Sequence, residues 1–299
     1  MSAAPARAVG ILARPDLVEA RDVLRELCAF LLARGQRVLL EQRTAQLADG
    51  GLAQGCEALP EGDLAARVDL IVVLGGDGTL LAASRLIEPA VPVLAVNFGS
   101  LGFLTEVALS ELYPTLELAL EGRCQQEERR LLRARVEREG APARLDDVLN
   151  DVVVTKTARS RLLDLDVTID GRFVSSFRAD GLIVSSPTGS TAYNLSAGGP
   201  ILHPLLPALV VTPICPHMLS HRPLVVHDHS TVEVRVRPAR DLEAQVAFDG
   251  QRDQEILPGD TLTVTRSPRV LRLVKAPARD YFEILRTKLK WGEPTARRT

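Results

Sequence analysis

No two cysteines of this chain are close enough in sequence to form a metal or redox motif. Cys28, Cys56, Cys124 and Cys215 are far apart and make no CxxC pair. This spacing is typical of free thiols in a reducing compartment, rather than of a disulfide or zinc framework.

Long apolar runs are also missing. No apolar stretch approaches the roughly 18 residues that a membrane-spanning helix needs. The first residues, MSAAPARAVGILARPD, lack the charged region, apolar stretch and cleavage site of a secretory signal. We therefore expect a cytoplasmic protein without membrane contact.

The sequence has almost no excess of one charge. The formal net charge is −2 and the isoelectric point about 6.3, which argues against broad electrostatic binding to nucleic acid. With 46% apolar and 25% charged residues, the 299-residue chain can bury a proper core and stay in solution. An anionic ligand would have to be neutralised locally, by backbone N–H groups, a few arginines or a metal.

Short apolar runs alternate with helical patterns in the first 125 residues. Uncharged, β-branched runs predict strands at residues 8–13, 37–41, 69–76 and 91–99. Apolar residues near helical spacing predict helices at residues 17–35, 79–87 and 109–122. This alternation is typical of a parallel sheet covered on both faces, so we predict an α/β domain over residues 1–125.

The pattern changes after residue 125. Runs that alternate by twos predict strands within residues 131–139, 149–156 and 161–176, and in further segments as far as residue 276. Asp170-Gly171 is a strong signal for a hairpin turn. We therefore predict a mostly antiparallel β domain over residues 126–276. A helix within residues 278–292 should pack back on the first domain, which makes residues 277–299 a separate terminal segment.

The segment RVDLIVVLGGDGTLL, residues 67–81, joins a buried strand to a helix through a glycine-rich turn. Open α/β sheets bind ligands at such strand ends, and glycines let a phosphate approach backbone N–H groups. The phosphate-binding candidates are Gly75, Gly76, Gly78 and Thr79. No lysine follows, so the turn is not a P-loop, and it is not the dinucleotide GxGxxG either.

Asp77 is the unusual residue of this turn. A carboxylate among phosphates is repulsive unless it binds a cation or takes a proton from a nucleophile. The structural alternative is an aspartate that only caps the next helix, because turns favour Asp and Gly on their own account.

A second polar segment, RADGLIVSSPTGSTAYNLSAGGPILHP, covers residues 178–204. It combines many hydroxyl and amide groups with one aromatic ring, which suits a nucleotide base and ribose. The alternative is a solvated loop rich in serine and threonine. Between the two segments, Asn150 and Asp151 precede a strand. They could read an adenine edge and hold ribose hydroxyls, or only form a turn.

The five histidines all fall between residues 203 and 229. His217, His221, His227 and His229 could supply metal ligands, but Pro213, Pro216 and Pro223 interrupt any helical spacing. We favour histidines that are satisfied or face solvent, and predict no metal site made of protein ligands alone.

These segments together resemble the NAD kinases, which make NADP from NAD with ATP or polyphosphate. The matching segments are GGDGT (75–79), NFGSLGFLTE (97–106), LNDVVV (149–154), DGLIVSSPTGSTAYNLSAGGPILHP (180–204), HRPLVV (221–226), FDGQ (248–251) and DYFEILRTKLKWG (280–292). They occur in the family's order over nearly the whole chain. GGDGT alone is weak, because lipid kinases and phosphofructokinases carry related versions, whereas the long serine- and threonine-rich segment is specific.

The resemblance implies a Rossmann-like N-terminal domain, a β-sandwich C-terminal domain and a final helix returning to the first domain. It implies that Asp77 is the general base for the 2′-hydroxyl of the adenosine ribose. The NAD contacts that it implies are Asp77, Gly78, Asn150, Asp151, Arg161, Arg178, Asp180, Thr188, Thr191, Ala192, Tyr193, Asn194, Leu195, Ser196 and Gln251.

The resemblance also implies the partners of the reaction. Mg²⁺ or another divalent metal would arrive with ATP, bound through phosphates and water. Arg178 favours ATP over polyphosphate, and a homodimer or homotetramer is expected. Two alternatives are a lipid or sugar kinase that shares GGDGT, and a protein that binds NAD without catalysis.

Overall fold

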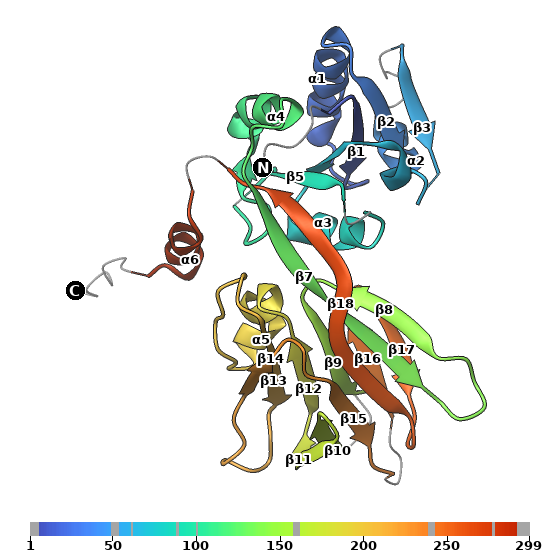
Figure 1. The fold of residues 1–299 in the computed structure, drawn as a ribbon, viewed down its shortest axis with the longest axis vertical. Coiled ribbons are helices and arrows are strands. Elements are labelled where there is room, and N and C mark those ends of the chain that lie inside the picture. Colours follow the sequence, from blue (N-terminus) through green and yellow to red (C-terminus); the bar gives the residue numbers. More distant parts are fainter. Residues whose placement is uncertain are drawn as a thin grey trace. The chain divides into compact units, whose positions relative to one another are not determined.

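The computed structural model describes residues 6–48, 54–60, 62–87, 90–99, 101–157, 162–238, 243–276 and 279–291. The chain divides into two compact units, whose elements are labelled in Figure 1. Unit 1 comprises residues 1–128 and 271–299, and unit 2 comprises residues 129–270. No helix in the described part of the chain is long and apolar enough to cross a membrane.

Unit 1 is built on a parallel sheet whose five main strands have the order β5-β4-β1-β2-β3. These strands are β1 (Ala8–Ala13), β2 (Arg37–Glu41), β3 (Cys56–Leu59), β4 (Leu70–Leu74) and β5 (Pro92–Asn97). A short strand, β6 (Val107–Ala108), pairs with the end of β5. This is the Rossmann order, so the predicted α/β fold is confirmed, and the topological switch point lies between β1 and β4.

Helices cover both faces of this sheet. The helices of unit 1 are α1 (Ala20–Ala33), α2 (Gln42–Leu47), α3 (Asp77–Ser84), α4 (Leu112–Leu120) and α6 (Tyr281–Leu289), with short 3-10 turns η1 (Ala65–Arg67) and η2 (Leu109–Glu111), and, within the described residues, α6 is not among those packed on the sheet. Helices α1 and α4 pack on one face of the strands, and α3 lies on the other (Figure 1). The buried side chains of α1 recur every three or four residues along one side of the helix. This is the periodicity that predicted a helix here.

Strand β3 and helix α2 are among the elements of unit 1 that were not predicted. Strand β3 is exposed at its two middle residues, and α2 is only six residues long. Neither therefore shows the apolar run or the periodic pattern on which sequence-based prediction relies.

The last strand of the chain, β18 (Thr261–Val274), ends in unit 1. Its residues Arg272 and Leu273 pair in parallel with Pro92 and Val93 of β5. Val274 and Ala276 belong to the core of unit 1. Residues 271–276 therefore belong to unit 1, whereas the sequence pattern assigned them to the β domain.

Unit 2 consists of antiparallel strands in two sheets. One sheet has the order β14-β13-β12-β9-β16-β17, and the other contains β11-β10-β15-β18 with β7 beside β18 and β8 beside β7. The strands are β7 (Gln126–Glu137), β8 (Arg144–Val148), β9 (Asp151–Lys156), β10 (Leu163–Ile169), β11 (Arg172–Ala179), β12 (Gly181–Ser185), β13 (Ala208–Ile214), β14 (Leu224–His227), β15 (Val232–Val236), β16 (Ala244–Phe248) and β17 (Arg252–Ile256).

The core of unit 2 is made by alternate residues of both sheets. Val152 and Val154 of β9 and Leu165 and Val167 of β10 contribute to the same buried cluster. The predicted sandwich is thereby confirmed. The predicted hairpin turn is also present, because Asp170 and Gly171 both adopt the left-handed conformation, with φ of 52° and 72°.

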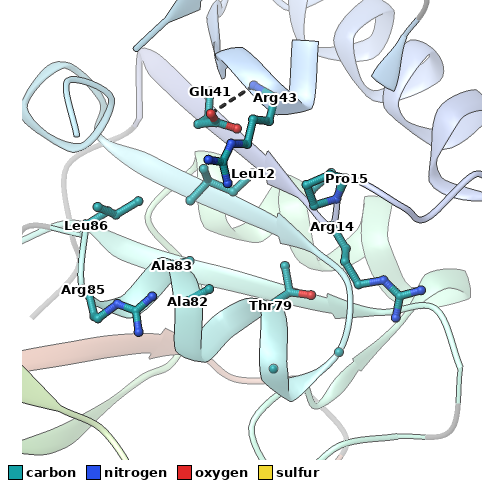
Figure 2. Close-up of a pocket in the computed structure, with 13 residues that line it drawn as sticks. Leu12, Arg14, Pro15, Glu41, Arg43, Thr79, Ala82, Ala83, Arg85 and Leu86 are labelled. Atoms are coloured by element: carbon teal, nitrogen blue, oxygen red, sulfur yellow. Dashed lines mark hydrogen bonds between the residues drawn. The ribbon is translucent and has the colours of Figure 1, made fainter. Parts of the chain in front are cut away.

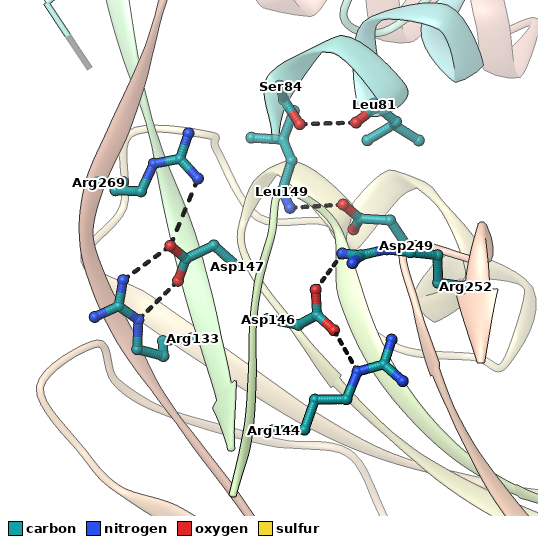
Figure 3. A network of polar contacts seen from close by, with 10 residues as sticks. All are labelled: Leu81, Ser84, Arg133, Arg144, Asp146, Asp147, Leu149, Asp249, Arg252 and Arg269. Atoms are coloured by element: carbon teal, nitrogen blue, oxygen red, sulfur yellow. Dashed lines mark hydrogen bonds and ion pairs between the residues drawn. The ribbon is translucent and has the colours of Figure 1, made fainter. Parts of the chain in front are cut away.

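Arginines neutralise two adjacent carboxylates of β8 (Figure 3). Asp147 accepts two 2.9 Å hydrogen bonds from Arg133 and lies 3.6 Å from Arg269, while Asp146 pairs with Arg144 and Arg252. Burial alone raises the pKa of Asp147, but its hydrogen bonds and the guanidinium charges bring that pKa below its ordinary value. The network is thus a paired, structural set of charges in unit 2.

Candidate functional site

The glycine-rich turn lies where β4 ends and α3 begins. Gly75 N donates to Val96 O at 3.0 Å, and the N–H groups of Thr79 and Leu80 donate to Gly76 O. A Cβ at position 75 would lie 2.3 Å from Thr79 Oγ1. The turn therefore needs glycine at position 75, and it directs the N-terminus of α3 toward the switch point of the sheet.

The carboxylate of Asp77 is held by a distant segment of unit 1. Oδ2 accepts the Phe103 N–H at 2.9 Å. Oδ1 accepts the Leu104 N–H at 3.2 Å, and the N–H and hydroxyl of Thr105 at 2.9 and 2.8 Å. The N-cap of α3 is Gly76, and no side chain caps that helix. The structural alternative of an Asp77 that caps its own helix is therefore wrong: its carboxylate accepts from residues 103–105.

Two cavities in unit 1 meet at this turn. The first, which we call the Asp77 cavity, has a volume of about 470 Å³ and is lined by Asp77, Asn97, Gly102, Glu19 and Lys288 among others. The second, the arginine cavity, has a volume of about 400 Å³. Arg14 and Gly76 line both of them.

The arginine cavity gathers positive charge at the ends of three elements. Figure 2 shows Arg14 after β1, Arg43 in α2 and Arg85 at the end of α3 around it. Glu41 also lines it, but its carboxylate caps α2 by accepting the N–H groups of Arg43 and Thr44 at 3.0 and 3.1 Å. Together with the start of α3, this chemistry suits an anionic ligand.

The sequence prediction missed these arginines. Arg14 follows the predicted strand 8–13 directly, and Arg43 is the second residue after the predicted strand 37–41. The rule that ligands bind beyond the carboxyl ends of parallel strands would have identified both.

Three segments of unit 2 that are far apart in sequence lie together. The carboxylate of Asp249 accepts the N–H groups of Leu149, Asn150 and Asp151 at 2.9, 2.7 and 3.2 Å. Ser186 N donates to Asn150 O at 2.8 Å. The predicted binding residues around 150, 186–196 and 249–251 therefore share one region of unit 2.

Several hydroxyl groups of the polar segment bond to backbone carbonyls, either of the segment itself or of residue 149. The Oγ atoms of Ser185 and Ser186 donate to carbonyls of residues 186 and 149, and that of Ser190 donates to Pro187 O at 2.6 Å. Fully buried Asn194 donates to Ser190 O and Pro200 O and accepts the Thr212 hydroxyl. The segment is thus an internally bonded loop, and fewer of its groups face outward than the sequence suggested.

Two other predicted residues differ in their exposure to solvent. Thr188 Oγ1 is buried without a hydrogen-bond partner among the described residues, and Tyr193 is 46% exposed. These residues lie in two short turns, η3 (Thr188–Thr191) and α5 (Tyr193–Ser196), which also hold Thr191, Leu195 and Ser196, with Ala192 between them.

The remaining predicted positions are spread over unit 2. Asp180 forms a 2.9 Å ion pair with Lys156, Arg178 is exposed on β11, and Gln251 is exposed after the Asp249-Gly250 turn. Arg161 lies outside the described residues.

Histidines and acids of unit 2 do not form a convincing cation site. Among the described residues, the ligand atoms of His227, Asp228 and His229 lie within 4.8 Å of one another. However, the buried Asp228 carboxylate already pairs with Arg130 and Arg266. His221 stacks on Phe177, with ring centres 4.6 Å apart. His227 and His229 are 58% and 71% exposed, so these two histidines face solvent.

Asp151 is the titratable group of unit 2 with the most altered environment. Its carboxyl is 4% exposed, and burial, followed by the negative charge of Asp249, raises its pKa to about 7. Folding therefore favours the protonated form between pH 3.8 and about 7.

We expect the stability of the protein to reflect this titration. Because the pKa is raised in the folded state, the associated stability is complete below the unfolded pKa and is lost as the pH rises through 7. Asp151→Asn should therefore become more stable relative to the parent between pH 5 and pH 8, by about 2–3 kcal/mol. Urea denaturation at both pH values measures the change. A pH-independent difference would contradict the buried titration.

Gly189 should be sensitive to substitution, because there is no room for a side chain at this position. A Cβ there would lie 2.2 Å from the backbone oxygen of Asn150. We expect Gly189→Ala to destabilise the protein by about 1–3 kcal/mol in thermal denaturation. Gly78→Ala is the control, because an added Cβ there meets nothing within 4 Å. Equal effects of both substitutions would contradict the close approach.

Family models match both parts of the chain. The model described as the ATP-NAD kinase N-terminal domain matches residues 9–124, and the ATP-NAD kinase C-terminal domain matches residues 149–276. Curated relatives named NAD kinase agree. The one from Citrifermentans bemidjiense is 47% identical over 287 residues, and covers 95% of this chain and 99% of the relative. The one from Pseudomonas aeruginosa is 44% identical over 289 residues, with coverage of 96% and 97%.

Solved structures show the same relationship. Yeast NADH kinase complexed with NADH aligns with a TM-score of 0.89 at 28% identity, covering 97% of this chain and 89% of that one. An NAD kinase from Archaeoglobus fulgidus in complex with ATP aligns with a TM-score of 0.73 at 25% identity, covering 95% and 98%. The matches in sequence and structure, over nearly the whole length, show that this chain belongs to the ATP-NAD kinase family.

Proposed function

We propose that the protein transfers the γ-phosphate of ATP, or the terminal phosphate of a polyphosphate, to the 2′-hydroxyl of the adenosine ribose of NAD. The product is NADP. The observation that carries this proposal is the GGDGT turn, which has a carboxylate in one adjoining cavity and arginines in the other. Phosphoryl transfer needs this division, because it depends on orienting a hydroxyl and neutralising phosphate charge.

The acceptor hydroxyl lies at the Asp77 cavity in this proposal. Asp77 is the carboxylate at the turn, and it accepts the proton of the ribose hydroxyl during transfer. Gly78 follows it in α3 and adds no side chain between the carboxylate and the substrate.

The phosphates of the donor bind at the arginine cavity. Arg14, Arg43 and Arg85 supply guanidinium groups, and the start of α3 adds backbone dipoles around Gly76 and Gly78. Asp77 and Glu41, one carboxylate of each cavity, accept backbone N–H groups. We propose that a divalent metal enters as part of the nucleotide substrate, on phosphate and water.

Unit 2 contributes to NAD recognition. Asn150, Asp151 and Thr188 supply polar groups, and the exposed ring of Tyr193 offers a stacking surface. We also propose four further NAD contacts that the family resemblance implies, namely Arg161, Arg178, Asp180 and Gln251. Asn194 acts by shaping the segment, because its amide is fully used inside unit 2.

The two alternatives predict different chemistry. A lipid or sugar kinase would leave the polar segment of unit 2 without a nucleotide to bind, and an NAD-binding sensor would have no need of the arginine cavity.

We also propose a homo-oligomer in the cytoplasm, consistent with the free thiols of Cys28, Cys56, Cys124 and Cys215. Light scattering after gel filtration tests the oligomer.

Asp77→Asn should abolish most turnover. The amide cannot take the proton, so we expect kcat to fall by about 10²- to 10⁴-fold while NAD affinity changes little. Formation of NADP from NAD, ATP and Mg²⁺ measures kcat, and calorimetry measures affinity. Asp22→Asn, on the exposed side of α1, is the control. Near-normal turnover of the Asp77 variant would rule out the base role, and no NADP from the parent with any donor would rule out the function.

Arg43→Gln should act on the donor alone. The loss of one charged contact to phosphate should raise the KM for ATP about tenfold and leave the KM for NAD unchanged. Arg37→Gln is the matched control, because Arg37 is 62% exposed on neighbouring β2 and does not line the cavity. An equal rise in the KM for NAD would show that the arginine cavity is not specific to the donor.

A further inference from the structure

The two oxygens of the Asp77 carboxylate are not equivalent. Oδ1 accepts three hydrogen bonds, from Leu104 N, Thr105 N and Thr105 Oγ1. Oδ2 accepts one, from Phe103 N. A carboxylate has about four lone-pair sites, two on each oxygen, so Oδ1 is saturated and Oδ2 keeps one site.

A buried amide sets the direction of the Thr105 hydroxyl. Asn97 Nδ2 lies 2.8 Å from Thr105 Oγ1 and can only donate to it, so the single hydroxyl proton of Thr105 is left for Oδ1 of Asp77. The amide itself is oriented, because Asn97 Oδ1 accepts the Gly99 N–H at 2.6 Å. Asn97 is 7% exposed and Thr105 is fully buried, so water does not compete readily for these bonds.

The backbone around this chain of bonds is held on both sides. A Cβ on Gly102 would lie 2.0 Å from Asp77 Oδ1 and 2.4 Å from Thr105 Oγ1, so only glycine lets the carboxylate approach this closely. On the other side, buried Glu106 pairs with Lys275, and its backbone oxygen accepts from Arg279. The donors of residues 103–105 therefore have little freedom to turn away from Asp77.

We propose that Asn97 and Thr105 are positioning residues for the transfer step, and that Oδ2 is the oxygen of Asp77 that receives the proton. This rests on the proposed function. Protonation of Oδ1 would direct a new O–H toward groups that are themselves donors, whereas Oδ2 has a site for it.

In the transfer step, the bond that forms is matched by one that breaks. The hydroxyl oxygen of the acceptor forms its bond to the γ-phosphorus, and its proton moves to Oδ2. The bond from that phosphorus to the β–γ bridging oxygen breaks, and its electron pair leaves on ADP. Asp77 afterwards returns the proton to water.

Two substitutions at position 105 test the hydroxyl. Thr105→Val keeps the shape but removes the donor to Oδ1, so kcat should fall by about 10- to 100-fold while the KM for NAD stays within about twofold. Thr105→Ser restores the hydroxyl and should recover kcat to within about threefold. Thr115→Val, at another buried threonine of unit 1, is the matched control and should leave kcat unchanged.

The same substitution in an Asp77→Asn background separates positioning from a merely structural effect. If Thr105 acts through Asp77, Thr105→Val should change the residual kcat there by less than about twofold. An equal loss in both backgrounds, or no loss in the parent, would overturn the positioning role. A normal kcat for Asp77→Asn alone would overturn the base role itself, which is a different failure.

Asn97→Asp tests the positioning role independently, and this test remains available if Thr105→Val does not fold. A carboxylate at position 97 can only accept, so the Thr105 hydroxyl would turn to it and leave Oδ1 of Asp77. We expect a loss of kcat close to that of Thr105→Val, with NAD affinity measured by calorimetry within about twofold. A normal kcat would contradict the proposal.

Discussion

The arrangement of the candidate site in unit 1 depends on the hydrogen bonds between the Asp77 carboxylate and residues 103–105. The bonds connect the first residue of α3 to the segment that follows β5, the neighbour of β4 in the sheet. The turn, the segment and the Asp77 cavity are therefore parts of one hydrogen-bonded structure. Its donors are mostly backbone N–H groups, which do not depend on side-chain rotamers.

Charge is distributed unevenly around this structure. Arg43 and Arg85 line only the arginine cavity, Asp77 lines only the other one, and Arg14 lines both, although the whole chain carries a net charge of only −2. Local concentration of charge at strand ends meets the requirement that an anionic ligand be neutralised without a basic surface. Elsewhere, as at Asp146 and Asp147, carboxylates and arginines pair with one another and stabilise the sandwich instead.

Close approaches that require glycine recur where polar segments meet. Gly75 faces Thr79, Gly102 faces Asp77, and Gly189 faces the backbone of Asn150. At Gly102 and Gly189 the missing side chain lets polar groups from different segments of a unit come together, and at Gly75 it allows the turn itself to close. The hydroxyls of the segment after β12 serve the same end, since they bond mainly to carbonyls nearby.

The sequence by itself determined the class of each unit and the family. Alternation of apolar strands and helices, and then of single residues, follows from which faces are buried, and the pattern is local. It also identified Asp77 as unusual, and it indicated that the segment around residues 180–204 binds a ligand rather than only connecting two strands. Strand β3 and helix α2 were missed, because one is half exposed and the other is too short to show a period.

Only the tertiary structure decided what each polar group does. Asp77 and Thr105 are 28 positions apart, and Asp249 and Asn150 are 99 apart, so no local pattern could pair them. Burial decided which hydroxyls bond internally, and it raised the pKa of Asp151 beyond what an exposed aspartate shows. Residue types set the chemistry that is available, but hydrogen bonds and desolvation depend on distances that arise only when distant segments pack together.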